Sequence, residues 1–293
     1  LDIFDHPAEL AHARGTEAGD FRQAPAVPRD TVDCSAFAPS FAAPVEPFLV
    51  QIYLHVPAQA EEAASLAKES DAGATRRGRT SLATQIARGS SLAFELTCKH
   101  AEIDEPYQRT VWQGVTQSVS FFVTPPDSAG IALPLKIAVF QDRAPIGQIR
   151  FTMPLRQAQG GPAERTIVGE ATRFRTAFAS YASPDRAEVL RRVQMLRMVG
   201  VKCFQDVLDL EPGQRWEQQL WKHIDEADVL FLFWSQHAKS SKWVTEEWRY
   251  GLKRRGVDFI RPVVLQRQPF IEPPAELCEL HFNDRVLSLI DDL

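Results

Sequence analysis

Two adjacent carboxylates, Glu246 and Glu247, lie between two tryptophans in the segment SKWVTEEW at residues 241–248. A carboxylate can act as a general acid or base, or it can stabilise a positive charge, if the fold holds it in a suitable place. Adjacent carboxylates on a helix surface are more often simply solvated. The apolar spacing predicts a helix over residues 240–256, and this helix separates the two side chains.

A helix turns by about 100° per residue, which places Glu247 on one narrow face with Trp243 and Tyr250. Val244 and Trp248 lie to one side of that face, as an apolar stripe that packs on a sheet. Glu247 is therefore expected at the boundary of the core, beside an indole. From geometry alone, a functional role and a structural role for Glu247 are equally open.

Glu246 lies on the other side of the helix, towards Lys242, Arg249 and Lys253. Ion pairs at spacings of three and four residues contribute only about 0.2–0.5 kcal/mol on a helix surface. Such pairs are a sufficient explanation for Glu246, so it is not expected to take part in chemistry.

The helix that carries these residues belongs to a series of alternating strands and helices. This alternation predicts an α/β fold with a parallel sheet flanked by helices. The predicted strands are residues 175–181, 201–207, 228–235, 258–266 and a short one at 276–284. The predicted helices are residues 184–200, 213–227, 240–256 and a closing one at 285–293. Ligands bind beyond the carboxyl ends of such strands. Ser180 and Tyr181 end the first strand there, and Asp206 begins the loop after the second.

The N-terminal half has a different pattern of apolar and polar residues. Residues 1–30 are expected to be a weakly ordered arm. Residues 31–156 mix period-two strands with turns and predict an antiparallel β-sandwich with a helical insertion. Residues 58–70 and 81–89 are expected to form two helices, with the basic residues 76–79 in the loop between them. Residues 157–168, with Gly-Gly-Pro at their centre, predict a linker before a second domain at 169–293.

Composition excludes several classes of function. The net charge of −5 argues against a nucleic-acid-binding protein. No apolar run reaches the ~18–20 residues that a membrane span needs, so no membrane partner is expected.

The seven histidines show no metal-ligand spacing, and no glycine-rich phosphate-binding motif occurs. Four scattered cysteines predict reduced thiols and a cytoplasmic location, with Cys203 and Cys278 buried in strands.

Three segments, AFASYASPD at 177–185, DVLDLEPGQRW at 206–216 and ADVLFLFWSQHAKSSKWVTEEW at 227–248, together resemble a bacterial Toll/interleukin-receptor (TIR) domain. The resemblance covers about residues 170–293 and implies a flavodoxin-like α/β fold. Many members of the family cleave NAD⁺ at the bond between nicotinamide and ribose. Their essential glutamate lies four residues after a Trp or Cys, which corresponds here to Glu247 counted from Trp243.

The resemblance therefore implies Glu247 as the catalytic residue, with Trp243, Ser180, Tyr181 and Asp206 as substrate-binding residues. NAD⁺ would be the substrate, and no separate cofactor or metal is implied. Nicotinamide leaves from a pyridinium that already carries positive charge, so a single carboxylate that stabilises the ribosyl cation suffices. The basic residue that often follows the Ser-Tyr pair in the family is absent, because Ala182 takes its place.

Two functions follow from the resemblance. The first is an NAD⁺ glycohydrolase, or a cyclase that releases a cyclic ADP-ribose isomer, acting in anti-phage defence. It would depend on self-association through the TIR domain and on an unknown activating ligand or protein. The N-terminal domain, whose role is otherwise unknown, would then regulate or assemble the TIR domain, or it would be a second domain with no ligand of its own. The alternative is a non-catalytic TIR interaction module for signalling or host mimicry.

Overall fold

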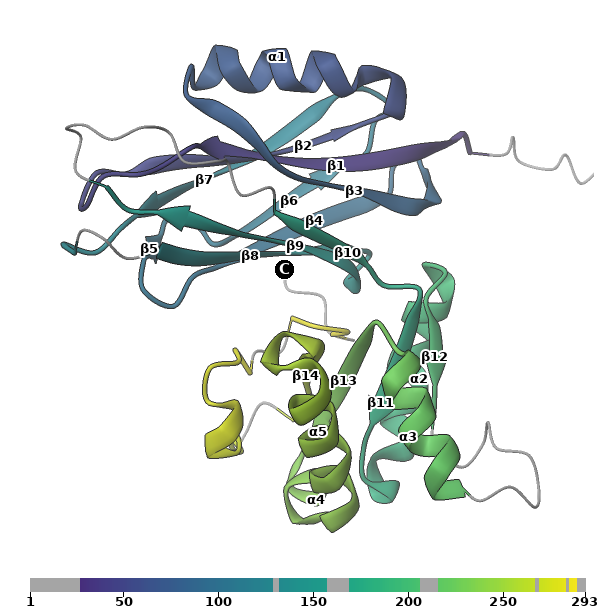
Figure 1. The fold of residues 1–293 in the computed structure, drawn as a ribbon. Coiled ribbons are helices and arrows are strands. Elements are labelled where there is room, and N and C mark those ends of the chain that lie inside the picture. The colour runs from purple at the N-terminus through teal and green to yellow at the C-terminus, as the bar shows by residue number, and fades with distance from the viewer. Residues whose placement is uncertain are drawn as a thin grey trace, which may run out of the picture.

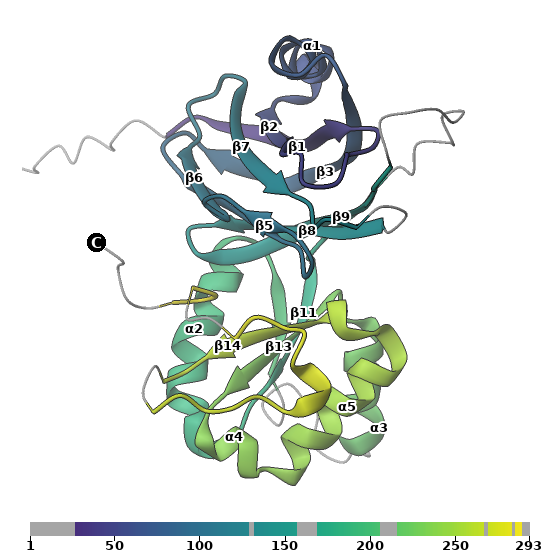
Figure 2. The ribbon, with the colours of Figure 1, turned by 90° about the vertical axis from the view of Figure 1, so that its left-hand side faces the viewer.

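A computed structural model describes residues 27–128, 132–156, 169–205, 216–266, 269–282 and 285–288. Figures 1 and 2 show two parts, an antiparallel sandwich and a smaller α/β part that lies against one of its sheets. The predicted linker at 157–168 lies outside the described residues.

The sandwich consists of two five-stranded sheets, which confirms the expected mainly β region. The first sheet has the order β3-β1-β2-β7-β5, and the second has the order β10-β9-β8-β4-β6. The strands of the first sheet are β1 Arg29–Pro39, β2 Phe48–His55, β3 Ala74–Ala87, β5 Glu102–Ile103 and β7 Gln117–Thr124. Those of the second are β4 Ser91–Thr97, β6 Tyr107–Val111, β8 Ala132–Gln141, β9 Ala144–Pro154 and β10 Glu170–Arg173.

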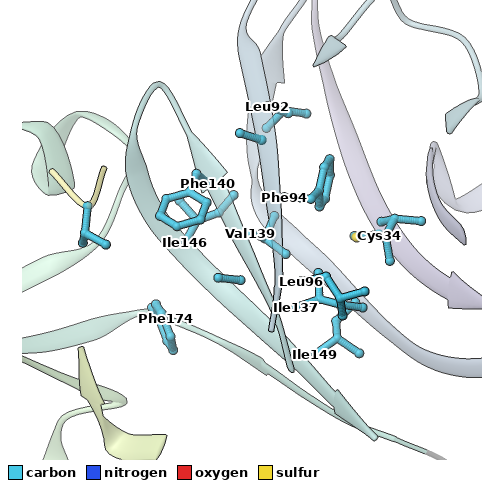
Figure 3. Packing of buried hydrophobic residues seen from close by; sticks show 14 of the residues in the cluster. Cys34, Leu92, Phe94, Leu96, Ile137, Val139, Phe140, Ile146, Ile149 and Phe174 are labelled. Carbon is cyan, nitrogen blue, oxygen red and sulfur yellow. The ribbon is translucent and has the colours of Figure 1, made fainter. Parts of the chain in front are cut away.

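Buried apolar side chains from the two sheets fill the space between them. Cys34 comes from the first sheet, and Phe94, Ile137 and Ile149 come from the second (Figure 3). Helix α1 (Ala60–Ser70), preceded by a 3₁₀ turn at Pro57–Gln59, packs on the first sheet through Ala63 and Ala67. Alternating inward side chains therefore specify this core, as the period-two pattern predicts.

The second predicted helix, at residues 81–89, is wrong, because these residues lie largely in strand β3. Locally the segment favours a helix, but β3 pairs with β1 over most of its length and buries Leu82 and Ile86. The basic residues 76–79 are likewise part of β3 and not a loop. Arg79 donates to Asp33 on the neighbouring strand, and the side chain of Arg77 is buried.

The two parts of the chain meet at a very short connection. Strand β10 pairs with β9 of the sandwich, so the sandwich extends past the predicted boundary at residue 169. Strand β11 (Thr176–Ser180), which belongs to the α/β part, begins after only two intervening residues. Phe174 is buried between them, and its amide donates to the carbonyl of Ile146 at 2.9 Å. The amides of Arg175 and Thr176 both donate to the Asp228 carboxylate.

The α/β part has a four-stranded parallel sheet, which confirms the predicted fold class. Its order is β12-β11-β13-β14, with β12 at Lys202–Phe204, β13 at Val229–Trp234 and β14 at Ile260–Val264. The helices are α2 Arg186–Met198, α3 Trp216–Glu226, α4 Gln236–Ser240 and α5 Lys242–Arg255, with 3₁₀ turns at Ser183–Asp185 and Val257–Phe259.

The C-terminal predictions are wrong where the structure describes them. The expected strand at 276–284 is a 3₁₀ helix at Ala275–Leu277 followed by turns, because two prolines, Pro273 and Pro274, immediately precede it. Without that strand Cys278 is exposed, whereas Cys203 is buried as expected. Residues 285–288 of the expected closing helix are not helical, and residues 289–293 lie outside the described part.

Charged side chains join the sandwich to the amino-terminal edge of the parallel sheet. Asp258, just before β14, accepts from Lys136 of β8 at 3.0 Å and from Arg150 of β9 at 2.9 Å. Arg261 of β14 donates to the side-chain oxygen of Gln148 at 3.3 Å. The carboxyl ends of the parallel strands therefore lie at the edge away from the sandwich (Figure 1).

Burial of Lys136 is expected to make stability depend on pH. Burial, followed by the charge of Arg261, lowers the pKa of the Lys136 amine from 10.5 to about 8, although Asp258 opposes the shift. Between these two values the unfolded chain holds more protons than the folded chain, so stability rises with pH. Relative to Lys136→Met, the wild type should gain on the order of 2–3 kcal/mol across this window. Urea unfolding at several pH values measures this, and parallel curves for the two proteins would contradict it.

Candidate active site

Helix α5 holds the two adjacent glutamates. Its first turn is capped by Ser241, whose hydroxyl oxygen accepts from the amide of Val244 at 3.3 Å. Farther along, Gly251 lets the helix lie close to the sheet, since a Cβ atom there would be 3.1 Å from the ring of Phe259 and 3.3 Å from Leu230. The cap and the close approach together fix the position of the helix face that carries Glu247.

Glu247 points into the domain and Glu246 points to solvent. The Glu247 side chain is 2% exposed, and the Ser180 hydroxyl donates to its Oε2 at 2.6 Å. Ser180 is the last residue of β11 and is itself fully buried. A hydroxyl donating to a carboxylate over this distance is a charge-assisted hydrogen bond, which is stronger than a neutral one. The contact places Glu247 at the carboxyl end of the central strands.

The expected ion pairs of Glu246 are absent from the described part of the chain. Arg249 instead donates to Glu276 at 2.6 Å, beyond the end of the sheet. Glu246 remains exposed. Glu246 is therefore a solvated surface carboxylate, and its position on the helix requires no ion-pair partner.

Aromatic side chains lie on the same face as Glu247. Trp243 is partly exposed, and its ring centroid lies 6.1 Å from that of Trp221 on α3. Trp221 in turn lies 4.6 Å from Tyr250, whose hydroxyl donates to Asp225 at 2.9 Å. Sequence reasoning did not single out Trp221, because its contact with α5 depends on the packing of two helices.

The other predicted substrate-binding residues are less closely tied to Glu247. Tyr181 follows Ser180, is partly buried and packs against the large apolar cluster. Asp206 lies outside the described residues, as does the rest of the loop at 206–213. The structure thus brings Ser180 into direct contact with Glu247 and places Trp243 one helical turn away.

A further polar contact at this edge was not predicted. The Ser235 hydroxyl donates to the Asp185 carboxylate at 2.5 Å and accepts from the amide of Ala238 at 3.0 Å. Ser235 follows β13 and Asp185 follows β11, so the contact joins the loops after two adjacent strands. Such an N-cap could be anticipated from the sequence, but its partner could not.

Within the described ranges, no group of three or more His, Cys, Asp or Glu side chains could hold a metal ion. Among the helices of those ranges, none has the length and apolar character required to cross a membrane.

The parallel sheet of order 2-1-3-4 and its flanking helices define an α/β domain. The buried Glu247 carboxylate gives this domain a polar site near the carboxyl edge of the sheet. The family model described as the TIR domain matches residues 178–289. This part of the chain is therefore a TIR domain, as the sequence motifs indicate.

Other comparisons add little. A search of curated proteins found no significant match. Among solved structures, WR4, a C. elegans MSP family member, is 9% identical with a TM-score of 0.20, covering 44% of this chain and 79% of that one. A Paenibacillus sp. cycloisomaltooligosaccharide glucanotransferase is 9% identical with a TM-score of 0.27, covering 70% of this chain and 27% of that one. Scores this low support no shared fold or function.

Removal of the Ser180 hydroxyl is expected to destabilise the domain. In Ser180→Ala the buried Glu247 carboxylate loses a hydrogen-bond donor, which should lower the free energy of unfolding by about 1–3 kcal/mol. Ser240→Ala is the matched control, because Ser240 is exposed and its hydroxyl donates to the Gln236 carbonyl of its own helix. Urea unfolding compares the two variants. Equal stabilities would show that the contact contributes nothing.

Proposed function

We propose that the TIR domain cleaves NAD⁺ at the N-glycosidic bond, with Glu247 as the catalytic carboxylate. The observation that supports this proposal is the burial of Glu247 at the carboxyl edge of the sheet, in contact with Ser180. In the reaction the bond from ribose to nicotinamide breaks, its electron pair neutralises the pyridinium, and water adds to the ribosyl carbon. The products are nicotinamide, ADP-ribose and a proton.

Each residue of the site has a distinct role in this proposal. The Glu247 carboxylate stabilises the positive charge that develops on the ribose, in a place from which water is largely excluded. Ser180 orients that carboxylate by donating to Oε2. Trp243, partly exposed one turn away, offers an aromatic face on which a base or a pyridinium can stack. Tyr181 and Asp206 would border the same substrate.

The wider role that we propose is depletion of NAD⁺ by a cytoplasmic effector in defence against phage, with self-association through the TIR domain and control by the sandwich. Nicotinamide release from NAD⁺ tests the chemistry, measured for the full chain in dilute solution and with a crowding agent. Release should rise as the chains associate. If nicotinamide stays absent when light scattering shows assembly, the alternative of a non-catalytic interaction module replaces the proposal.

A further inference from the structure

A large cavity lies between the sandwich and the amino-terminal edge of the parallel sheet. Its volume is about 1080 Å³, slightly above the ~300–1,000 Å³ typical of small-molecule sites. The sandwich contributes Lys136, Arg150 and Phe151 to its wall, and the TIR side contributes Asp258, Ile260 and Arg261. The cavity is therefore separate from Glu247, which lies towards the opposite edge of the sheet.

Positive charge in this wall is incompletely balanced. Lys136 and Arg150 share the carboxylate of Asp258, and Arg150 also donates to Glu170 at 2.7 Å. Arg261 is only 8% exposed, yet its hydrogen bond goes to the neutral amide of Gln148. In the part of the chain that the structure describes, no carboxylate lies within ion-pair distance of Arg261. A buried guanidinium without a direct ion pair is costly, so the site favours an incoming anion.

The pKa shifts of Lys136 and Arg261 are consistent with this excess of positive charge. Burial is the main cause that lowers the pKa of both Lys136 and Arg261, and the charge of Arg261 lowers that of Lys136 further. Glu95 and Asp258 act in the opposite direction on Arg261 but do not cancel the effect of burial. An anion beside these two groups would favour their charged forms and so raise both pKa values.

We propose that this cavity binds a small molecule that carries a phosphate, with the phosphate between Lys136 and Arg261. Guanidinium groups match the geometry of phosphate oxygens, and an ammonium adds a compact second charge. The rest of the molecule lies against the accessible apolar part of the wall, which includes Pro134, Val257 and Leu280. The site is independent of the proposed NAD⁺ cleavage and requires no catalytic residue.

The position of the two cations gives the ligand a regulatory effect. Lys136 belongs to the sandwich and Arg261 to the TIR domain, so one phosphate contacts both parts at once. The phosphate also competes with Asp258, whose contacts with Lys136 and Arg150 join the same two parts. Occupancy of the cavity therefore changes how the TIR domain is held against the sandwich.

Isothermal titration calorimetry of the full chain tests the proposal with three probes: inorganic phosphate, adenosine monophosphate and adenosine. Wild type should bind adenosine monophosphate, and Lys136→Met should weaken that binding on the order of tenfold. Lys253→Met is the control, because it removes an exposed lysine of α5 and should leave binding unchanged. Adenosine, without a phosphate, should not bind.

A second variant tests whether a loss of binding in Lys136→Met could come only from misfolding. Glu95→Gln removes a nearby negative charge that acts on Arg261, so it should tighten the binding of adenosine monophosphate several-fold. Binding of inorganic phosphate with the same dependence on Lys136 and Glu95 would show that the cavity recognises the free anion. The proposal is overturned if neither phosphate probe binds, if Lys136→Met binds as tightly as Lys253→Met, or if adenosine binds as well as its phosphate.

Discussion

Glu247→Gln is expected to lower nicotinamide release from NAD⁺ by a factor of about 10²–10³, while Glu246→Gln leaves it unchanged. The amide has the size and shape of the carboxylate and can still accept from Ser180, so the fold should persist. It lacks the negative charge that stabilises the ribosyl cation, and the loss is large because the site is buried. Initial rates of nicotinamide release at saturating NAD⁺ give the comparison.

Glu246→Gln is a close control, because it makes the same chemical change one residue away on an exposed face. Both variants should unfold at similar urea concentrations and should assemble to the same extent as the wild type. Retention of full activity in Glu247→Gln would remove this residue from the catalytic role. An equal loss in both variants would point to the net charge of α5 and not to the buried carboxylate.

Trp248→Ala is expected to destabilise the TIR domain by about 3–5 kcal/mol. The Trp248 side chain is 2% exposed and belongs to the apolar cluster that holds α5 on the sheet. Its truncation leaves a cavity under the helix that carries Glu247. Arg249, whose guanidinium lies 5.2 Å from the centre of the Trp248 ring, would also lose a favourable contact. Urea unfolding followed by tryptophan fluorescence measures the change.

Trp243→Ala is the matched substitution on the same helix, and its expected effect is of another kind. Trp243 is partly exposed, so its truncation should cost much less stability than that of Trp248. If it stacks on the substrate, its loss should raise KM for NAD⁺ about tenfold, since a stacked base is worth roughly 1–3 kcal/mol. A similar loss of stability in both variants would show that Trp243 serves only in packing.

Periodicity predicted the features that depend on near neighbours in the chain. The helix over residues 240–256 and the opposite orientations of Glu246 and Glu247 follow from the angle per residue, and the structure shows both. The buried strand at Val229–Trp234 follows from its unbroken apolar run. These patterns are read within a single element, so no knowledge of the tertiary arrangement is needed.

Features that depend on distant partners were not predictable. The local pattern of residues 81–89 predicts a helix. Their strand structure depends instead on the pairing of β3 with β1, which joins segments about fifty residues apart. The contact of Ser180 with Glu247 joins residues 67 positions apart, and that of Lys136 with Asp258 joins residues 122 apart. No local pattern specifies such pairs, which arise only when packed elements bring their ends together.

The short connection between β10 and β11 limits how the two parts of the protein can move. Only Phe174 and Arg175 separate the strands, Phe174 is buried, and Asp228 holds the amides of Arg175 and Thr176. The TIR domain therefore cannot drift away from the sandwich on a long tether. Any tilt of the TIR domain against the sandwich would have its pivot at this connection, so a small tilt there would become a larger displacement at the distant edge where Glu247 lies.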